Sequence, residues 1–336
     1  MTKLRPIHCL LAGCFAATLA AQDGTVFRSE VSLVSVTATV RDANGGVIGG
    51  LDVEQFRIVD GGEEQKIVVF ERQTDRPLSV LLLVDASLSA AVELEFERAS
   101  AKRFMTNLFG DGAHEDDRLG VMKFSEGVDL LAPLTRRSGV VERALDRIRP
   151  ESGTSLYDGV LLASEELQKR DGRRVIIILT DGGDTTSYST YRQAIEAAQS
   201  ADVVIYSVIV QPVKADAGRN IGGENTLYLF AQGTGGKAFV EYGEDGLNRA
   251  FGEILENLRT QYLLGYYQPP HNDLRSRYRE IEVSVDIPDA TVLARSGYYV
   301  PEERRLLPES IPTGSVETER RPEGRWRQAT PAESAK

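Results

Sequence analysis

Acidic and hydroxyl residues follow directly after an apolar run at residues 81–84. Asp85, Ser87 and Ser89 stand at alternate positions after Leu81-Leu-Leu-Val84. One carboxylate and two hydroxyls offer oxygen ligands to a hard divalent cation. The apolar run predicts a buried strand of a parallel sheet, and open α/β sheets bind their ligands at the carboxyl ends of such strands. Three polar residues in one turn are common, so a metal site requires further oxygen donors on other loops.

Two later loops carry such donors. Thr154 stands in Gly153-Thr-Ser155, just before a segment whose apolar residues have helical spacing. Asp181 follows a second apolar run, Val175-Ile-Ile-Ile-Leu179, and Asp184 comes three residues later. Two loops that follow core strands and one that precedes a helix thus present carboxylate and hydroxyl oxygens. A shared metal site is the simplest interpretation.

This pattern resembles the metal-ion-dependent adhesion site of von Willebrand factor type A domains. The resemblance implies that one divalent cation, Mg²⁺ or Mn²⁺, is held by the five positions Asp85, Ser87, Ser89, Thr154 and Asp181. In that family the hydroxyls contact the ion, and the aspartates bind it directly or through water. Neutral hydroxyl ligands leave the ion much of its charge, so it binds a carboxylate from an Asp or Glu of a partner protein. Asp184 either hydrogen-bonds to the groups that surround the ion, without binding it directly, or is a local turn residue.

Residues 77–262 alternate between buried strands and amphipathic helices. Apolar stripes at helical spacing mark helices that include Ala101 to Leu108 and Leu247 to Leu258, and the strand Val203 to Val210 lies between them. Such alternation predicts an α/β fold with a doubly wound, mostly parallel sheet. The resemblance to a von Willebrand factor type A domain covers this whole segment.

Two β flanks enclose that segment. Residues 28–75 and 263–301 each contain period-2 patterns, for example at Val34 to Val40 and at Ile281 to Ile287. Within the first flank, residues 56–61 and 66–70 are predicted to form a hairpin. Each flank alone would leave open strand edges, so we expect both to pair into one antiparallel β-sandwich with the α/β segment inserted. This order resembles bacterial secreted proteins that carry a von Willebrand factor A-related domain between such flanks.

The two ends of the chain are predicted to lie outside the folded part. Residues 1–21 have a basic start and a short apolar stretch, which indicates a signal peptide and an extracytoplasmic (secreted or periplasmic) protein. Cys14 follows Leu11-Ala-Gly13, so lipid anchoring at this cysteine is the alternative. Residues 303–336 are rich in Arg, Glu, Pro and Ser and are predicted to be a disordered tail.

Composition excludes several classes of function. The formal net charge is −11, and the predicted signal peptide contains Lys3 and Arg5 but no acid, so the mature chain is more acidic still. An acidic chain lacks the electrostatic footprint of a nucleic-acid-binding protein. No segment after residue 21 is long and apolar enough to be a transmembrane helix.

We expect no enzymatic activity. Ser125 lies in a weak likeness of a nucleophile elbow, but Lys123 stands where that motif needs glycine. A binding module that grips a partner carboxylate through the ion is therefore the leading interpretation. The alternative is a structural envelope scaffold in which the metal only stabilises the loops.

Overall fold

The computed structural model describes residues 32–72, 76–211, 221–269, 277–300 and 327–328. From Leu33 onward these residues belong to one compact unit. The predicted signal peptide lies outside the described residues. Of the predicted tail, only Arg327 and Gln328 are described.

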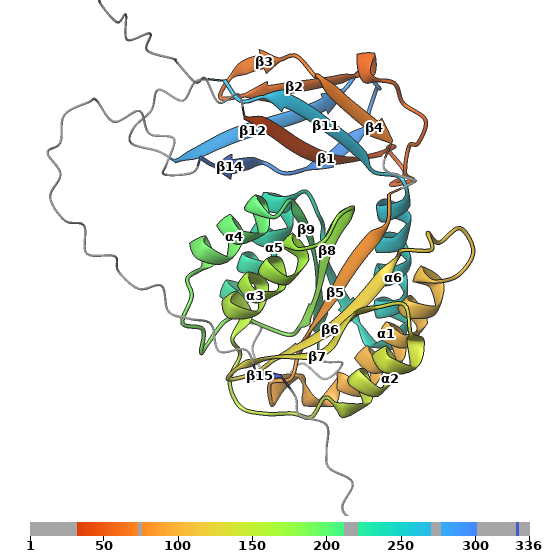
Figure 1. Ribbon diagram of the computed structural model, residues 1–336, viewed down its shortest axis with the longest axis vertical. Helices are drawn as coiled ribbons and strands as arrows, with labels where there is room; N and C mark the ends of the chain where they lie inside the picture. The colour runs from red at the N-terminus through yellow and green to blue at the C-terminus, as the bar shows by residue number, and fades with distance from the viewer. Residues whose placement is uncertain (1–31, 73–75, 212–220, 270–276, 301–326, 329–336) are drawn as a thin grey trace, which may run out of the picture. The chain divides into compact units, whose positions relative to one another are not determined.

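Six strands of the inserted segment and the two-residue strand β15 form a seven-stranded sheet (Figure 1). In spatial order its strands are β10 (Ala238–Tyr242), β9 (Val203–Gln211), β8 (Arg173–Thr180), β5 (Leu78–Asp85), β6 (Arg118–Phe124), β7 (Val128–Thr135) and β15 (Arg327–Gln328). Only the β6–β7 pair is antiparallel. Strand β5 is buried along its whole length, as expected for an apolar run covered on both faces.

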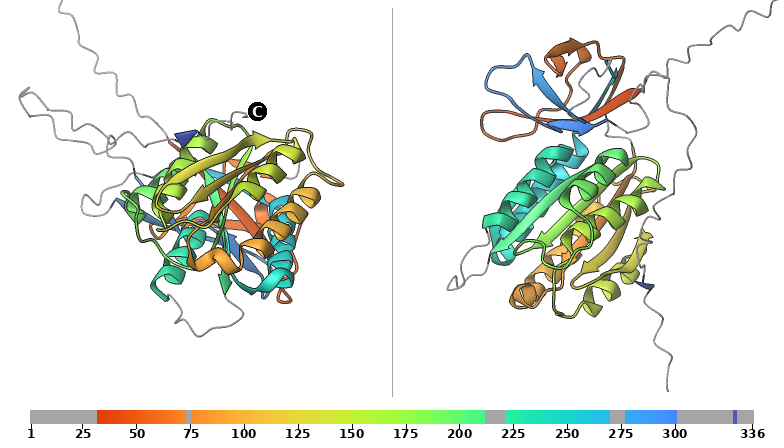
Figure 2. Two further views of the ribbon diagram at one scale, coloured as in Figure 1. Left: turned by 90° about the horizontal axis from the view of Figure 1, so that it is seen from below. Right: turned by 90° about the vertical axis from the view of Figure 1, so that its left-hand side faces the viewer.

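Helices cover both faces of this sheet (Figure 1 and Figure 2). One face carries α1 (Leu94–Leu108), α2 (Ser138–Arg147) and α6 (Gly243–Arg259), and the other carries α3 (Leu156–Gln168), α4 (Tyr191–Ser200) and α5 (Ile221–Thr234). Alternate residues of β5 serve the two cores: Leu82 packs on the first side and Leu83 on the second. The predicted doubly wound α/β fold is confirmed.

The two β flanks pair with each other. One antiparallel sheet has the order β13 (Thr291–Ala294), β1 (Leu33–Arg41), β11 (Tyr262–Tyr267) and β4 (Val69–Arg72). The other has the order β14 (Gly297–Tyr299), β12 (Tyr278–Val285), β2 (Phe56–Asp60) and β3 (Glu63–Gln65). Each sheet takes strands from both flanks, and residues such as Val36, Ile58 and Tyr262 share one apolar core. The predicted antiparallel flanks around an inserted α/β sheet are therefore present.

The predicted hairpin of residues 56–61 with residues 66–70 is wrong in its pairing. Strand β2 pairs with β3 across a tight turn at Gly61 and Gly62, both of which have positive φ. Strand β4 pairs instead with β11 in the other sheet. Strand β4 approaches β11 closely at Gly265, where the chain has no Cβ. A Cβ at this position would lie only 2.8 Å from Cβ of Val69.

A buried acid joins the two flanks. Asp60 at the end of β2 is fully buried, and its Oδ2 accepts hydrogen bonds from the hydroxyls of Tyr266 (2.9 Å) and Tyr298 (3.0 Å). Its Oδ1 accepts a 2.7 Å bond from Nε of Arg279, which is also an ion pair. All three donors belong to the C-terminal flank, so this network holds one flank against the other.

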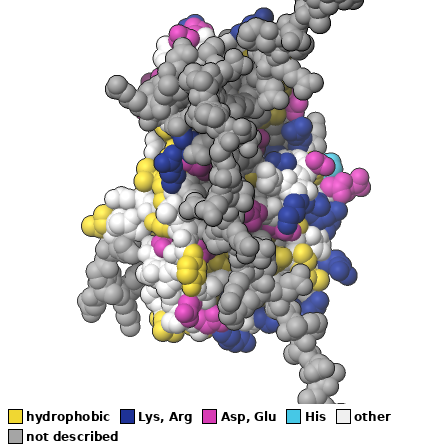
Figure 3. Space-filling view, turned by 60° about the vertical axis from the view of Figure 1, so that its left-hand side comes forward, with side chains coloured by type: hydrophobic (Ala, Val, Ile, Leu, Met, Phe, Trp, Pro, Cys, Tyr) yellow, Lys and Arg dark blue, Asp and Glu magenta, His cyan; other side chains and the backbone are white. Residues whose placement is uncertain are grey.

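The surface mixes both signs of charge. Acidic and basic side chains are interspersed over the part of the face in Figure 3 that the described residues form. Within the described ranges, no helix combines the length and the apolar character needed to cross a membrane.

Candidate metal centre

The predicted site residues lie at the carboxyl edge of the central sheet. Asp85 ends β5, and Asp181 directly follows β8. These two strands are neighbours in the sheet, yet the chain continues from β5 to β6 on one side and from β8 to β9 on the other. This is the topological switch point, where the loops diverge and leave a crevice outside the strand ends.

Asp85 is held by two hydrogen bonds. Its Oδ1 accepts a 2.7 Å bond from the backbone N–H of Ser87, and its Oδ2 accepts a 2.6 Å bond from the hydroxyl of Thr180. The side chain is fully buried, and this burial raises the pKa of Asp85 to about 6, although both hydrogen bonds favour the charged form. The nearby charge of Asp181 acts in the same direction as burial.

Three of the five predicted ligands contact one another directly. The hydroxyls of Ser87 and Ser89 are 3.0 Å apart, and the Ser89 hydroxyl donates a 3.2 Å hydrogen bond to Oδ1 of Asp181. Ser89 begins the short 3₁₀ helix η3 (Ser89–Val92), which leads into α1. The structure thus places these three oxygen-bearing side chains in one row beside Asp85.

The Thr154 loop is joined to the other two loops through its backbone. The N–H of Glu151 donates to the carbonyl of Ala86 at 2.7 Å, and the N–H of Thr185 donates to the carbonyl of Thr154 at 2.8 Å. The hydroxyl of Thr154 takes part in none of the hydrogen bonds found among the described side chains. It therefore remains available to a ligand.

Gly153 allows this loop to pack closely. Its φ is +80°, and an added Cβ would lie 2.9 Å from Cα of Glu126 and 3.0 Å from the hydroxyl of Thr186. Only glycine adopts such a backbone without strain and also fits this space. The position of Thr154 therefore depends on the residue that precedes it.

Asp184 has a local partner. Its Oδ1 accepts a 3.2 Å hydrogen bond from the N–H of Tyr157 and a further bond from the hydroxyl of Ser187. Asp158 makes the converse connection, because its carboxylate accepts bonds from the N–H groups of Tyr188 and Ser189. The two acids fasten the loop after β8 to the start of α3.

Sequence reasoning missed three residues beside the site. Thr180 binds Asp85, while Glu93 and Glu97 are buried at the beginning of α1, with exposed fractions of 4% and 1%. Thr180 stands directly before Asp181, at the end of the apolar run. Glu97 occupies a position where the apolar stripe of α1 would have an apolar residue. An acid at a position of the apolar stripe is the sequence signal that could have identified Glu97.

The donor set fits a hard divalent cation. Its donors are carboxylate and hydroxyl oxygens, and no salt bridge between described residues involves Asp85 or Asp181. Asp85 is fully buried, and a buried carboxylate without a cationic side chain calls for another positive charge. No three His, Cys, Asp or Glu side chains of the described ranges group as a metal site. A site in these residues would therefore depend on hydroxyl oxygens as well as carboxylates, which are ligands of hard divalent cations.

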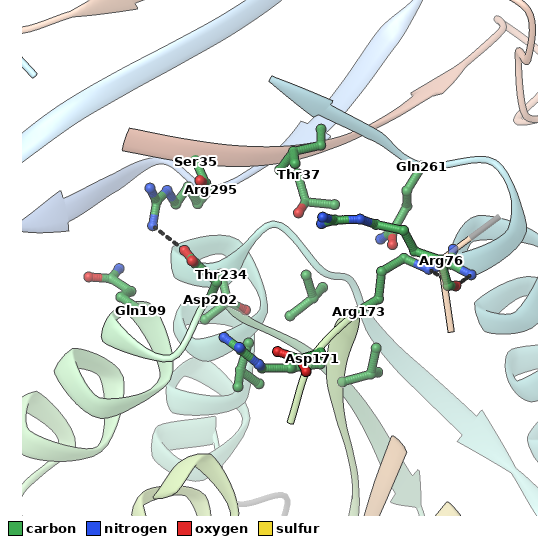
Figure 4. Close-up of a pocket in the computed structure, with 16 residues that line it drawn as sticks. Ser35, Thr37, Arg76, Asp171, Arg173, Gln199, Asp202, Thr234, Gln261 and Arg295 are labelled. Atoms are coloured by element: carbon green, nitrogen blue, oxygen red, sulfur yellow. Dashed lines mark hydrogen bonds and ion pairs between the residues drawn. The ribbon is translucent and has the colours of Figure 1, made fainter. Parts of the chain in front are cut away.

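A cavity lies at the opposite edge of the sheet. It has a volume of about 420 Å³, and Arg173 and Arg174 at the start of β8 and Val203 at the start of β9 contribute to its lining. Figure 4 shows Arg295 and Asp202 in its wall, 3.9 Å apart as an ion pair. Its arginines are bound to backbone carbonyls or acids of the chain itself, for example Arg173 to the carbonyl of Arg76. It is separate from the candidate metal centre.

Comparison with known sequences identifies the segment that carries the site. Residues 80–183 match the von Willebrand factor type A domain family. An uncharacterized protein of Borreliella burgdorferi is 27% identical over 140 residues, which are 38% of this chain and 39% of the relative. An uncharacterized protein of Synechocystis sp. is 31% identical over 111 residues, which are 32% of this chain and 25% of the relative. The chain therefore spans well under half of either relative.

The chain is also similar to several solved structures. The von Willebrand factor type A protein from Catenulispora acidiphila is 12% identical, with a TM-score of 0.45, over 82% of this chain and 76% of that one. The vWF domain of the type V pili tip protein Mfa5 from Porphyromonas gingivalis is 16% identical, with a TM-score of 0.45, over 54% and 94%. Proximal thread matrix protein 1 from the mussel byssus, with a zinc-occupied MIDAS motif, is 16% identical, with a TM-score of 0.47, over 60% and 50%.

All five predicted ligands lie between residues 80 and 183. The part of the chain that bears the candidate metal centre is thus matched to the von Willebrand factor type A domain, and the two β flanks lie outside that match.

Proposed function

We propose that this chain is an extracytoplasmic protein-binding module, of adhesion or scaffold type, that binds a partner carboxylate through a divalent cation. The observation that carries the proposal is the row of oxygens formed by Ser87, Ser89 and Asp181, next to a buried Asp85 that has no cationic partner among the described side chains. The signal-peptide pattern of residues 1–21 supports the location.

Asp85, Ser87, Ser89, Thr154 and Asp181 would hold Mg²⁺, or Mn²⁺ in its place. When bound, the cation supplies a positive centre that accepts an oxygen of a partner's Asp or Glu. The chain's own residues fix where this happens. Thr180 and the Ser87 N–H orient Asp85, and Gly153 sets the position of Thr154. The hydroxyl ligands add no negative charge, so an incoming carboxylate meets little repulsion from them.

The proposal assigns binding and no catalysis to this site. Ser125, the serine with a weak nucleophile-elbow pattern, donates its hydroxyl hydrogen to Oε2 of Glu151 at 2.8 Å. The partner of the Ser125 hydroxyl is thus the Glu151 carboxylate, whereas a catalytic triad places a histidine there as the base. Nδ1 of His114 accepts a hydrogen bond from the N–H of Asp116, and His271 lies outside the described residues.

The test has two steps. First, binding of Mn²⁺ to the full chain is measured by electron paramagnetic resonance, with Asp181→Asn as the variant. We expect one bound ion for the wild type and a loss of affinity for the variant. Second, peptides from a random displayed library are selected on the chain in Mg²⁺. The selected peptides should contain Asp or Glu, should lose binding when that residue is changed to Asn or Gln, and should detach in chelator.

The outcomes separate the two functions considered. Absence of Mn²⁺ binding to the wild type would refute the metal site. If the chain binds Mn²⁺ but the selected peptides stay bound in chelator, the carboxylate bridge is refuted. This result would favour the scaffold function, in which the ion only stabilises loops.

A further inference from the structure

Glu97 is an acid on the sheet-facing side of α1. The buried positions of this helix, at the spacing of one helical face, include Leu94, Ala101, Phe104, Met105 and Leu108. Glu97 lies three residues after Leu94 and four before Ala101, so it shares their face and is 1% exposed. Leu94 packs in the same core as Val84 and Ala86, the two neighbours of Asp85 in the chain. This face of α1 therefore meets the sheet at the carboxyl end of β5.

Both carboxylate oxygens of Glu97 lack a hydrogen-bond partner among the described residues. The hydroxyl of Ser100, three residues further along the same helix, is also buried and without a partner there. Buried carboxylates are almost always paired or hydrogen-bonded, since an isolated one loses its hydration without replacement. Two unpartnered polar groups on one helix face indicate a small polar space that water or an ion completes.

The charges of the candidate metal centre act on the Glu97 carboxyl. Burial raises its pKa well above the usual value, and the charges of Asp85 and Asp181 raise it further. Arg98 opposes this effect, but its guanidinium donates a hydrogen bond to the carbonyl of Ile148 and forms no ion pair with Glu97. Two predicted metal ligands thus act electrostatically on a buried acid that forms no ion pair with the described residues.

We propose that Glu97 is a positioning residue of the divalent-cation site. In this proposal the Glu97 carboxylate binds water that lies between it and the ligands Asp85 and Asp181. This inference rests on the proposed metal site and adds to it an acid that the five-residue pattern does not contain. Carboxylates behind metal ligands orient them and the waters around the ion, and their removal costs about 10- to 100-fold in metal affinity. The same acid adds negative charge close to the cation, which strengthens cation binding.

The experiment compares the full chain with two variants of the same helix. Glu97→Gln keeps the side-chain length and removes the charge, and Glu95→Gln does the same at an exposed position two residues earlier. The dissociation constant of Mn²⁺ and the resonance spectrum of the bound Mn²⁺ are measured at pH 7. We expect at least about 10-fold weaker binding and an altered spectrum for E97Q. For E95Q we expect binding within about 2-fold of the wild type.

The metal-free melting temperature provides a second readout. E97Q should melt at a higher temperature than the wild type in chelator, because a buried carboxylate without a partner is lost. If E97Q does not fold by circular dichroism, Glu97→Met, an apolar side chain of similar length, takes its place in the same comparison. An unchanged Mn²⁺ dissociation constant and spectrum would overturn the inference and leave Glu97 a purely structural acid. Failure of the wild type to bind Mn²⁺ would instead overturn the proposed metal site itself, and the inference with it.

Discussion

The hydroxyl of Thr180 donates a 2.6 Å hydrogen bond to Oδ2 of Asp85 and thereby joins the ends of β8 and β5. Both residues are fully buried, and the Thr180 oxygen also accepts a 3.1 Å bond from the N–H of Gly182. One side chain therefore orients the central acid of the candidate site and the loop that carries Asp181. The bond connects the two strands between which the chain changes direction.

We expect Thr180→Val to destabilise the protein by about 1–3 kcal/mol, because Asp85 and Gly182 each lose a buried partner. Urea unfolding at pH 7 measures this change. The control is Thr106→Val, whose hydroxyl donates to the carbonyl of Lys102 at an exposed position on α1 and should cost less than about 0.5 kcal/mol. Equal costs for the two variants would contradict the role given to Thr180.

Mg²⁺ should stabilise the wild type against heat. Under the proposed function the folded state binds the ion and the unfolded chain does not, so Mg²⁺ at 100 times its dissociation constant adds about 2.7 kcal/mol. Asp181→Ala should lose most of the rise in melting temperature, while Asp111→Ala, at an exposed turn before β6, should keep it. A wild type with equal melting temperatures in Mg²⁺ and in chelator would argue against the site.

Asp85 should make the metal-free protein sensitive to pH. Its folded pKa of about 6 exceeds the ordinary aspartate pKa of 3.8, so between these values the folded state binds more protons than the unfolded chain. The stability contributed by this group is therefore present below pH about 4 and falls as the pH rises to about 6, by on the order of 3 kcal/mol. In chelator, Asp85→Asn should gain stability relative to the wild type over this window. A difference that does not vary with pH would contradict the prediction.

Gly153→Ala should disturb the Thr154 loop. The new methyl group would lie 2.9 Å from Cα of Glu126, and the φ of +80° is strained for alanine, so we expect a cost of about 1–3 kcal/mol and weaker Mn²⁺ binding. Gly127→Ala is the matched control, because no atom lies within 4 Å of its added Cβ. Calorimetric titration with Mn²⁺ and urea unfolding provide the two measurements. Similar behaviour of both variants would remove the argument for Gly153.

Asp60→Ala should destabilise the sandwich strongly. It removes the carboxylate that binds Arg279 and two tyrosine hydroxyls, and breaking such a buried network costs about 3–5 kcal/mol. Glu63→Ala on the exposed strand β3 serves as the control and should change the free energy of unfolding by less than about 0.5 kcal/mol. Guanidinium unfolding followed by circular dichroism would show the difference. A small effect of Asp60→Ala would mean that its network does not hold the flanks together.

Local patterns sufficed to predict the central sheet and the row of candidate ligands. The runs Leu81–Val84 and Val175–Leu179 are apolar because parallel strands are covered on both faces, and this placed Asp85 and Asp181 at one edge. Ser87, Ser89 and Asp181 then meet through side-chain contacts. The neighbouring ends of β5 and β8 bring Asp85 and Asp181 to one edge, and the turn that leads into η3 then brings Ser89 to Asp181.

Long-range pairing was harder to predict. Strand β11 contains Gly265 and β14 begins with Gly297, and neither was identified as a strand because glycine weakens the pattern. The partner of β4 depends on the close approach of Gly265 to Val69, which no local rule contains. Glu97 was missed for a related reason, since it interrupts the apolar stripe of α1 and its burial depends on the sheet beneath it.

The pairing of β1 with β11 and β13 has a consequence for how the chain is made. In the register of this sheet, Val36 pairs with Leu264 and Val40 pairs with Val292. Both partners are synthesised more than 200 residues later than β1. At about 5–20 residues per second of synthesis, β1 therefore stays without its neighbours for on the order of ten seconds or more. Its exposed edge invites association between nascent chains during that time.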